Sequence, residues 1–384
     1  MARRGGARLG WGAGVCLLVT LGVAAPAGAH IWWTNQGSDS IGRARPNGEV
    51  AIRNFIATAD APHGVAIDDG HVYWAQGASR GSIGRARLNG SGATQNFIRT
   101  GENVRGVALD SFGIYWSHLV SGAGAIGRAN LDGSGVNPIF ISTSGPPCGV
   151  AVDPDKLYWA NSGDPGALGR AHGPFDVDPT FINAGGDPCG VAVTNDYIYW
   201  ANRGGNTIGR AWRDGTHVRQ SFIPAQGACG VAVNESRIYW TSTATNSIGA
   251  ARLDGTGINP FLIKGASAPC GIAVDPTASA SPRSYQYPPT KVGGRGQIHA
   301  FFIQNTSSSV LGARRVRIAG QDPDDFKRTG DGCSVVATPA GGGCVVNVRF
   351  SPVAPGDRAA TILVSSNASD SPTSIPVSGF GISP

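Results

Sequence analysis

A tryptophan recurs at nearly constant intervals through much of this chain. The recurring residues are Trp33, Trp74, Trp116, Trp159, Trp200 and Trp240, so successive copies lie 41, 42, 43, 41 and 40 residues apart. A period of about 40 to 45 residues is typical of the four-stranded blades of β-propellers. The repeat therefore predicts six blades, and few other architectures accommodate it.

Each repeat divides into four short strands. In the fifth repeat these are "GVAV" at 190–193, "YIYWAN" at 197–202, "TIGRAW" at 207–212 and a final strand ending in "SFI" at 221–223. Short apolar and β-branched runs separated by turn residues indicate strands. The composition of 58 Gly, 25 Pro and 15% charged residues agrees with an all-β chain.

The two ends of the repeat region predict how the ring closes. The first repeat begins with "HIWWTN" at 30–35, which is a second strand without a first, and the last runs into "CGIAVD" at 270–275, a first strand without a second. Pairing of these fragments would complete one blade and remove two exposed sheet edges. We therefore expect a closed propeller over residues 30–276.

Residues 1–29 have the pattern of a signal peptide. A cationic start is followed by an apolar stretch and by the small residues Ala27, Gly28 and Ala29. Cleavage after Ala29 would remove three arginines and lower the formal net charge from +6 to +3, which is too weak to favour nucleic acid. We expect a secreted or cell-surface protein without an integral membrane segment in the mature chain. The residues after Arg3 and Arg4 fit the general secretory route better than twin-arginine export, but the sequence does not decide between the two routes.

The repeats resemble a known family. "LYWAN", "IYWAN" and "IYWTS", followed by "IGRA" or "IGAARLDGTG" and by "PCGVAVD", are similar to the class B (YWTD) repeats of low-density lipoprotein receptors. The resemblance covers residues 30 to about 276 and implies a binding scaffold. The chain departs from the family where the motif ends in Asp, because those positions are Asn35, Gln76, His118, Asn161, Asn202 and Ser242.

A second all-β region follows the propeller. Residues 277–290 are rich in Ser, Pro and Ala, as expected of a linker. The several strands within 291–384 predict a small immunoglobulin-like sandwich. "VRFSPVAPGDRAATILVSSN" and "IPVSGFG" resemble the choice-of-anchor D group of such domains. Cys333 and Cys344 lie near two strand ends in that pattern, and export favours a disulfide between them.

One position of the first strand changes identity around the ring. The residue before the first-strand glycine is His63, Arg105, Cys148, Cys189, Cys229 or Cys270. Because the first strand of each blade lines the channel, these six residues should form a ring near one channel mouth. The four cysteines are open to three interpretations: thiolate ligands of a soft metal with His63, disulfides between neighbours, or small buried apolar residues.

Five arginines share one position of the third strand. They are Arg43, Arg85, Arg128, Arg170 and Arg210, with Ala250 in the sixth repeat. They could form an anion-binding belt, but residues spread evenly around a ring cannot converge on one ligand. We expect each guanidinium to stack on an aromatic ring or to hydrogen-bond between blades.

The sequence favours a binding protein over an enzyme. It contains no H-E-x-x-H or C-x-x-C metal signature, and no cofactor is expected. We expect an extracellular protein or glycan to bind at the channel mouth. The candidate ligand-binding residues are His63, Arg105, Asn35, Gln76, His118, Asn161 and Asn202. A lyase or hydrolase with His63 as general base and a purely structural surface protein are the alternatives; the sequence does not indicate the oligomeric state.

Overall fold

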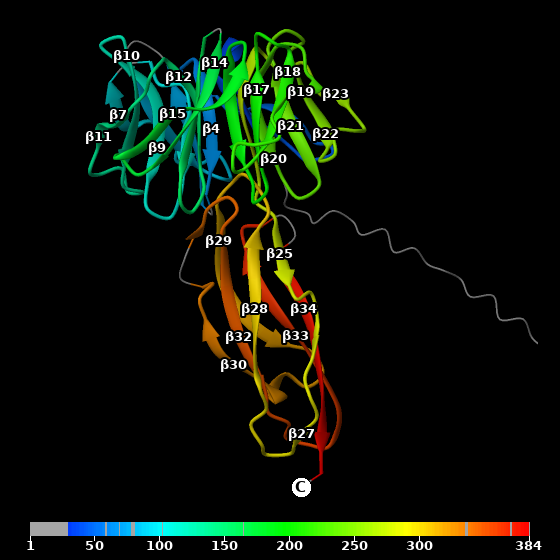
Figure 1. Ribbon diagram of the computed structural model, residues 1–384. Coiled ribbons are helices and arrows are strands. Elements are labelled where there is room, and N and C mark those ends of the chain that lie inside the picture. Colours follow the sequence, from blue (N-terminus) through cyan, green and yellow to red (C-terminus); the bar gives the residue numbers. More distant parts are fainter. Residues whose placement is uncertain are drawn as a thin grey trace, which may run out of the picture.

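The fold is described by a computed structural model that covers two all-β parts (Figure 1). The described residues are 30–57, 60–68, 70–77, 81–101, 103–163, 165–334, 337–368 and 371–383, with the backbone alone for residue 314. The predicted signal peptide therefore lies outside the described residues. Within them the chain forms strands and two short 3-10 helices, η1 (Gln36–Ser38) and η2 (Pro323–Asp325). None of the described helical segments is long and apolar enough to span a bilayer.

Six four-stranded antiparallel sheets form the propeller, as predicted. The first three blades, each given from its innermost strand outward, are β24 (Pro269–Val274), β1 (Ile31–Asn35), β2 (Ser40–Ala44) and β3 (Ile52–Ile56); β4 (Pro62–Ile67), β5 (His71–Gln76), β6 (Gly81–Arg87) and β7 (Thr94–Gly101); and β8 (Val107–Leu109), β9 (Ile114–Val120), β10 (Ala123–Ala129) and β11 (Asn137–Ser142). The other three are β12 (Pro147–Val152), β13 (Leu157–Asn161), β14 (Gly166–His172) and β15 (Asp176–Gly185); β16 (Pro188–Val193), β17 (Tyr197–Asn202), β18 (Thr207–Trp212) and β19 (Arg219–Pro224); and β20 (Ala228–Val233), β21 (Arg237–Ser242), β22 (Ser247–Arg252) and β23 (Asn259–Lys264).

The recurring tryptophan is the packing centre of each blade. Trp200, for example, is fully buried and lies opposite Gly209 on the next strand. A Cβ atom built on Gly209 would lie 2.1 Å from the indole ring, so only glycine leaves room for it. The same cross-strand pair occurs in every blade, which explains why the sequence repeats both "YW" and "IG".

The ring closes through its two ends, as the sequence predicts. Strand β24 pairs antiparallel with β1, with Val274 opposite Ile31 and Ile272 opposite Trp33. Asp275, directly after β24, also accepts hydrogen bonds from the His30 main-chain nitrogen at 2.8 Å and from the Trp32 indole nitrogen at 2.8 Å. Closure thus combines main-chain pairing with one buried carboxylate.

The C-terminal part consists of two sheets around one core. One sheet has the strand order β25 (Ala278–Ser281), β28 (Ile298–Asn305), β32 (Gly343–Phe350) and β30 (Phe326–Asp331). The other has the order β26 (Tyr285–Gln286), β34 (Thr373–Ile382), β33 (Gly356–Ser366), β29 (Leu311–Ala319) and β31 (Ala337–Thr338), with β27 (Thr290–Lys291) also pairing with β34. Buried side chains of both sheets meet in a single cluster.

The sequence predicts a linker at 277–290, but this segment forms strands in the structure. It contributes β25, β26 and β27, and Tyr287 between them is buried in the core of the C-terminal part. The Tyr287 hydroxyl donates a hydrogen bond to the Val348 carbonyl oxygen at 2.8 Å. The chain therefore passes from the last propeller strand into the second part within a few residues.

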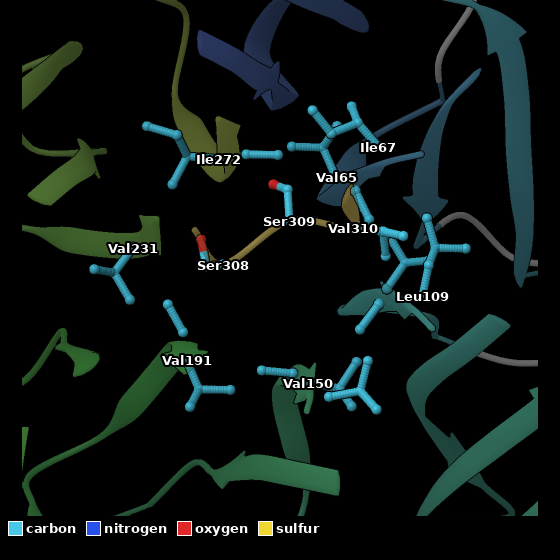
Figure 2. A pocket seen from close by; sticks show the side chains of 17 residues that line it. Val65, Ile67, Leu109, Val150, Val191, Val231, Ile272, Ser308, Ser309 and Val310 are labelled. Carbon is cyan, nitrogen blue, oxygen red and sulfur yellow. The ribbon is translucent and has the colours of Figure 1, made fainter. Parts of the chain in front are cut away.

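The second part closes one end of the propeller channel. Its β28–β29 loop enters the channel, where the Ser308 amide donates to the Val233 carbonyl oxygen at 2.9 Å and the Ser309 hydroxyl donates to that of Val274 at 2.5 Å. Val310 packs against buried propeller residues, including Val107 and Leu109. Figure 2 shows this loop surrounded by the aliphatic side chains of the innermost strands.

Candidate functional site

The six predicted ring residues lie in cyclic order at the start of the innermost strands. A Cβ built on each following glycine would lie 2.2 to 2.8 Å from the carbonyl oxygen of the next ring residue. The contacts run from Gly64 to Arg105, from Gly106 to Cys148, and so on around to Gly271 and His63. Glycine is therefore required because neighbouring backbones nearly touch. We call the face carrying this end of the channel the mouth face.

Hydroxyl groups that sequence reasoning missed tie the ring together in three blades. The residue after the tryptophan bridges its own first strand and the next one. Thr34 Oγ1 accepts from the Gly271 amide at 2.7 Å and donates to the His63 carbonyl oxygen at 2.7 Å. The equivalent hydroxyls are those of Ser117 and Thr241. The available signal was Thr or Ser after the repeated tryptophan in three blades, where the other three have Ala.

The four channel cysteines form two disulfides. Cys148 pairs with Cys189, and Cys229 with Cys270, each with its Cα atoms 4.9 Å apart. Of the three interpretations, the disulfide one matches the structure. The evenly spaced repeat seemed to oppose close approach of only some neighbours, but the narrow channel brings neighbouring first strands within disulfide range. Cys333 and Cys344 are also paired, as predicted.

His63 and Arg105 are the two exceptions in the ring, and both side chains are half-buried. Gln36 Nε2 donates a hydrogen bond to His63 Nδ1 at 2.7 Å, so the neutral ring carries its proton on Nε2. Burial, with the positive charges of Arg105 and Arg203, lowers the pKa of His63 to about 4. His63 is therefore neutral near pH 7. Gln36 and Arg203 were not predicted as members of this group.

Arg203 lies on the mouth face in an ion pair. Its Nη2 is 2.7 Å from Asp187 Oδ2, and its Nε donates to the same oxygen at 2.8 Å. Asp187 precedes β16 and Arg203 follows β17, so the pair joins the two kinds of loop that make this face. The sequence contains no repeat signal for the pair, because neither residue recurs at its position in the other blades.

Five predicted ligand-binding residues lie inside the blades. Asn35, Gln76, His118, Asn161 and Asn202 are only 1 to 5% exposed. Each donates to a main-chain carbonyl oxygen of an outer strand, as Asn35 Nδ2 does to Arg53 at 2.8 Å and Asn161 Nδ2 does to Pro179 at 3.1 Å. The structure does not bring these side chains to the mouth surface with His63 and Arg105. Four of these contacts hold the second strand of a blade to its fourth strand, and that of Asn202 reaches Ala184 on the outer strand of the preceding blade.

The third-strand arginines stack on aromatic rings, as predicted. The guanidinium carbon of Arg85 lies 3.7 Å from the Phe97 ring centroid, and that of Arg210 lies 3.9 Å from that of Phe222. Arg210 Nη1 also donates to the Leu253 carbonyl oxygen of the next blade at 3.1 Å. Arg43 and Arg170 make similar stacks, whereas Arg128 lies farther from its ring, at 5.7 Å from the Phe140 centroid. These cations thus belong to the scaffold.

Three aspartates after first strands form a further repeated contact that the sequence analysis did not identify. Asp68, Asp110 and Asp153 each accept from two turn amides and from the tyrosine hydroxyl of the next strand. Asp275 holds the equivalent place at ring closure. The recurring Asp after "GVAV" was visible in the sequence, and its role is structural.

The channel interior formed by the described residues is too small to hold an organic ligand. A cavity of about 60 Å³ lies between the ring and the β28–β29 loop, lined by aliphatic residues of all six innermost strands. Pockets for small organic ligands typically measure about 300 to 1,000 Å³. Among the described residues, the channel interior is therefore too small for an organic ligand, and the mouth face is the part of the channel region where a larger partner can make contact.

Comparison with known proteins supports the propeller fold. No protein-family model and no curated protein matches the sequence. A chain in the crystal structure of a nidogen/laminin complex is 23% identical, with a TM-score of 0.55 over 64% of this chain and 98% of that one. A gluconolactonase from Xanthomonas campestris gives 15% identity and a TM-score of 0.46, over 56% of this chain and 79% of that one. Regucalcin, a calcium-binding protein from Agrobacterium tumefaciens, gives 15% and 0.41, over 54% and 75%. The nidogen/laminin likeness concerns the fold alone.

The lowered pKa of His63 predicts how stability depends on pH. The pKa is about 4 in the folded protein and about 6.5 in the unfolded chain, so between these values the unfolded state binds the proton more tightly. The contribution of neutral His63 to the free energy of unfolding is therefore fully present above pH 6.5 and is lost as the pH falls toward 4. It amounts to about 3 kcal/mol. Urea unfolding at pH 7 and at pH 4.5 measures this fall in the free energy of unfolding. His63→Gln should make the difference between the two pH values much smaller.

The control is His217→Gln, because His217 is exposed on an outer turn. Its pH dependence should match that of the wild type. Identical pH dependence for His63→Gln and the wild type would contradict the assignment of the lowered pKa to His63.

Proposed function

We propose that this protein is exported and acts as a non-enzymatic binding protein whose propeller holds a protein partner on its mouth face. Three disulfides within the described residues suit an oxidising compartment, which agrees with the signal peptide predicted for residues 1–29. The YWTD-like motifs support assignment of residues 30–276 to that group of propellers. The proposed location is outside the cell or at its surface.

The observation that carries this proposal is the closure of the channel. The β28–β29 loop fills one end, and the ring of two disulfides, His63 and Arg105 narrows the other. With a cavity of only about 60 Å³ between them, a partner contacts loops on the outside of the ring. A rigid face built from short loops suits recognition of another macromolecule better than enclosure of a small substrate.

The charges on this face suggest what the partner presents. Arg105 and Arg203 both lower the pKa of His63, but Arg203 is paired with Asp187, so Arg105 supplies the positive charge next to His63 in the ring. Arginine recognises carboxylates well because its planar guanidinium forms paired hydrogen bonds. We therefore propose that an acidic side chain of the partner lies against Arg105.

The geometry gives less support to a lyase or hydrolase. His63 has an amide, Gln36, as the partner of Nδ1, whereas a histidine general base is usually oriented by a carboxylate. A conjugate-acid pKa of about 4 also makes His63 a weak base at neutral pH. The enzymatic alternative thus requires a different base.

We propose that the C-terminal part is an immunoglobulin-like domain of the choice-of-anchor D kind. Its two sheets around one core and its motifs "VRFSP" and "IPVSGFG" support this assignment. Its strand pairing places its first strand at Ala278, so we propose a boundary near Thr277 in place of a linker to residue 290. Its β28–β29 loop also fastens it to the propeller.

A double substitution tests the binding proposal. The mature protein is immobilised and exposed to secreted and cell-surface proteins of the producing organism, and the captured protein is identified and purified. His63→Ala combined with Arg105→Ala should weaken its binding at least tenfold by calorimetry, because an arginine at the centre of an interface often dominates affinity. The melting temperature should not fall.

Arg87→Ala is the matched control, because Arg87 is exposed at the end of β6 far from the mouth face. It should bind like the wild type. Unchanged affinity in the double variant would reject the mouth face as the binding site. If the wild type binds a glycan on an array and the double variant does not, the proposed partner is a carbohydrate and not a protein.

A further inference from the structure

The four channel cysteines are close enough to act as a single group. Their side chains form one buried cluster. Sulfur atoms of different disulfides also approach each other, since Cys189 Sγ and Cys229 Sγ lie 3.9 Å apart. The sulfur atoms of Cys189, Cys229 and Cys270 all lie within 4.8 Å of one another.

The separation between the two disulfides matches that of ligand sulfurs in a metal-thiolate centre. With zinc–sulfur bonds of about 2.3 Å, the ligand sulfurs of a tetrahedral site are roughly 3.8 Å apart. The sulfurs of Cys189 and Cys229, which belong to different disulfides, already lie near this spacing at 3.9 Å, and the bonded sulfurs within each disulfide move apart after reduction. His63 does not belong to the group of potential ligands that the described residues bring together, and its Nδ1 is bonded to Gln36.

We propose that the two channel disulfides are a redox-gated metal site, which after reduction binds one thiophilic cation such as Zn²⁺ or Cu⁺ through Cys148, Cys189, Cys229 and Cys270. Soft thiolate ligands select these d¹⁰ cations over Mg²⁺ or Ca²⁺. The four cysteines share the ring with His63 and Arg105, but the site uses only the four thiolates as ligands. It would make the narrowest part of the channel a sensor of the thiol state of its surroundings.

The chemistry requires two equivalents of a dithiol reductant. Each protein disulfide gains two electrons and two protons and becomes two thiols, while each dithiol is oxidised to its own disulfide. Binding of Zn²⁺ by four thiols then releases four protons and leaves a site of net charge −2. Removal of the cation and oxidation restores the disulfides.

The ring itself offers charge compensation for thiolates. Arg105 holds the ring position next to Cys148, because Gly106 contacts the Cys148 carbonyl group. A neighbouring cation lowers the pKa of a thiol and favours the thiolate that binds metal. The cysteine ring therefore combines sulfur spacing, burial and an adjacent positive charge.

Metal titration of the full mature chain tests the proposal. All proteins carry Cys333→Ala and Cys344→Ala, which removes the third disulfide. The protein is reduced with dithiothreitol, freed of reductant without oxygen and titrated with Zn²⁺ against a chromophoric chelator and with Cd²⁺. We expect one cation per chain, a cadmium-thiolate absorption band in the ultraviolet, and no binding by the oxidised protein.

A further pair of substitutions, Cys229→Ala with Cys270→Ala, should weaken zinc binding at least a hundredfold by removing two ligands. Tryptophan fluorescence monitors the fold throughout. If reduction alone unfolds the propeller, Zn²⁺ should restore the native spectrum. The proposal is overturned if the reduced protein binds no more cation than this variant, or if the cation fails to restore an unfolded reduced protein.

Discussion

Removal of the Cys229–Cys270 disulfide should lower the free energy of unfolding of the propeller by about 4 kcal/mol. The bond joins β20 to β24, the strand that completes the first blade, and it spans 41 residues. A crosslink over a loop of this length restricts the unfolded chain strongly. It also holds the closing strand against its neighbour. Cys229→Ala combined with Cys270→Ala, unfolded in urea without reductant and followed by tryptophan fluorescence, measures the loss.

The matched control is Cys333→Ala combined with Cys344→Ala, which removes the disulfide of the C-terminal part. Its loop spans only 11 residues, so the loss is smaller, about 3 kcal/mol, and falls on the other domain. The tryptophan signal reports mainly the propeller, where the six repeated tryptophans are buried. A loss below about 1 kcal/mol in the first variant would show that ring closure does not depend on this bond.

The propeller was predictable because its packing repeats. Each blade needs an indole over a glycine, as in Trp200 over Gly209, and this contact leaves both letters in the sequence at a fixed spacing. Closure followed from counting strands, since an unpaired "HIWWTN" and an unpaired "CGIAVD" can satisfy each other. Contacts required in every copy leave a periodic signal.

The pairing of the cysteines was less accessible from the sequence. A repeat shows that Cys148 and Cys189 hold equivalent positions, but disulfide formation depends on a separation of a few ångströms set by the width of the channel. The glycines that follow them carried the missing information. A Cβ on Gly149 would lie 2.4 Å from the Cys189 carbonyl oxygen, so these strands approach closely.

Only part of the predicted site comes together in the structure, again because the sequence does not show how close neighbouring strands and loops lie. The position after "YWT" or "YWA" ends the second strand, and we placed its side chain on the loop surface. In the structure Asn35 lies beneath the loop and satisfies an outer-strand carbonyl group. Ser, Pro and Ala at 277–290 suggested a linker, yet the alternating Tyr285 and Tyr287 were a strand signal that composition concealed.

The carboxylate of Asp275 should be worth about 3 kcal/mol to the closed ring. It is 8% exposed and accepts from Trp32 Nε1, His30 Nδ1 and the His30 main-chain nitrogen. Asp275→Ala would leave the buried Trp32 indole N–H without an acceptor, and an unsatisfied buried donor costs about 1 to 3 kcal/mol. In the mature chain predicted from the sequence, the His30 nitrogen is the terminal ammonium, so the substitution also removes an ion pair.

Asp68→Ala is the control. It removes an aspartate at the equivalent position of another blade, where no chain ends meet. Asp68 holds the equivalent position after β4, but its acceptor contacts are to Gly70, His71 and Tyr73 of its own blade. Hydrogen exchange should therefore accelerate at β1 and β24 amides in Asp275→Ala and stay unchanged there in Asp68→Ala. Equal protection of β24 in the two variants would contradict a closing role for Asp275, because a contact that joins the chain ends must fail at those ends first.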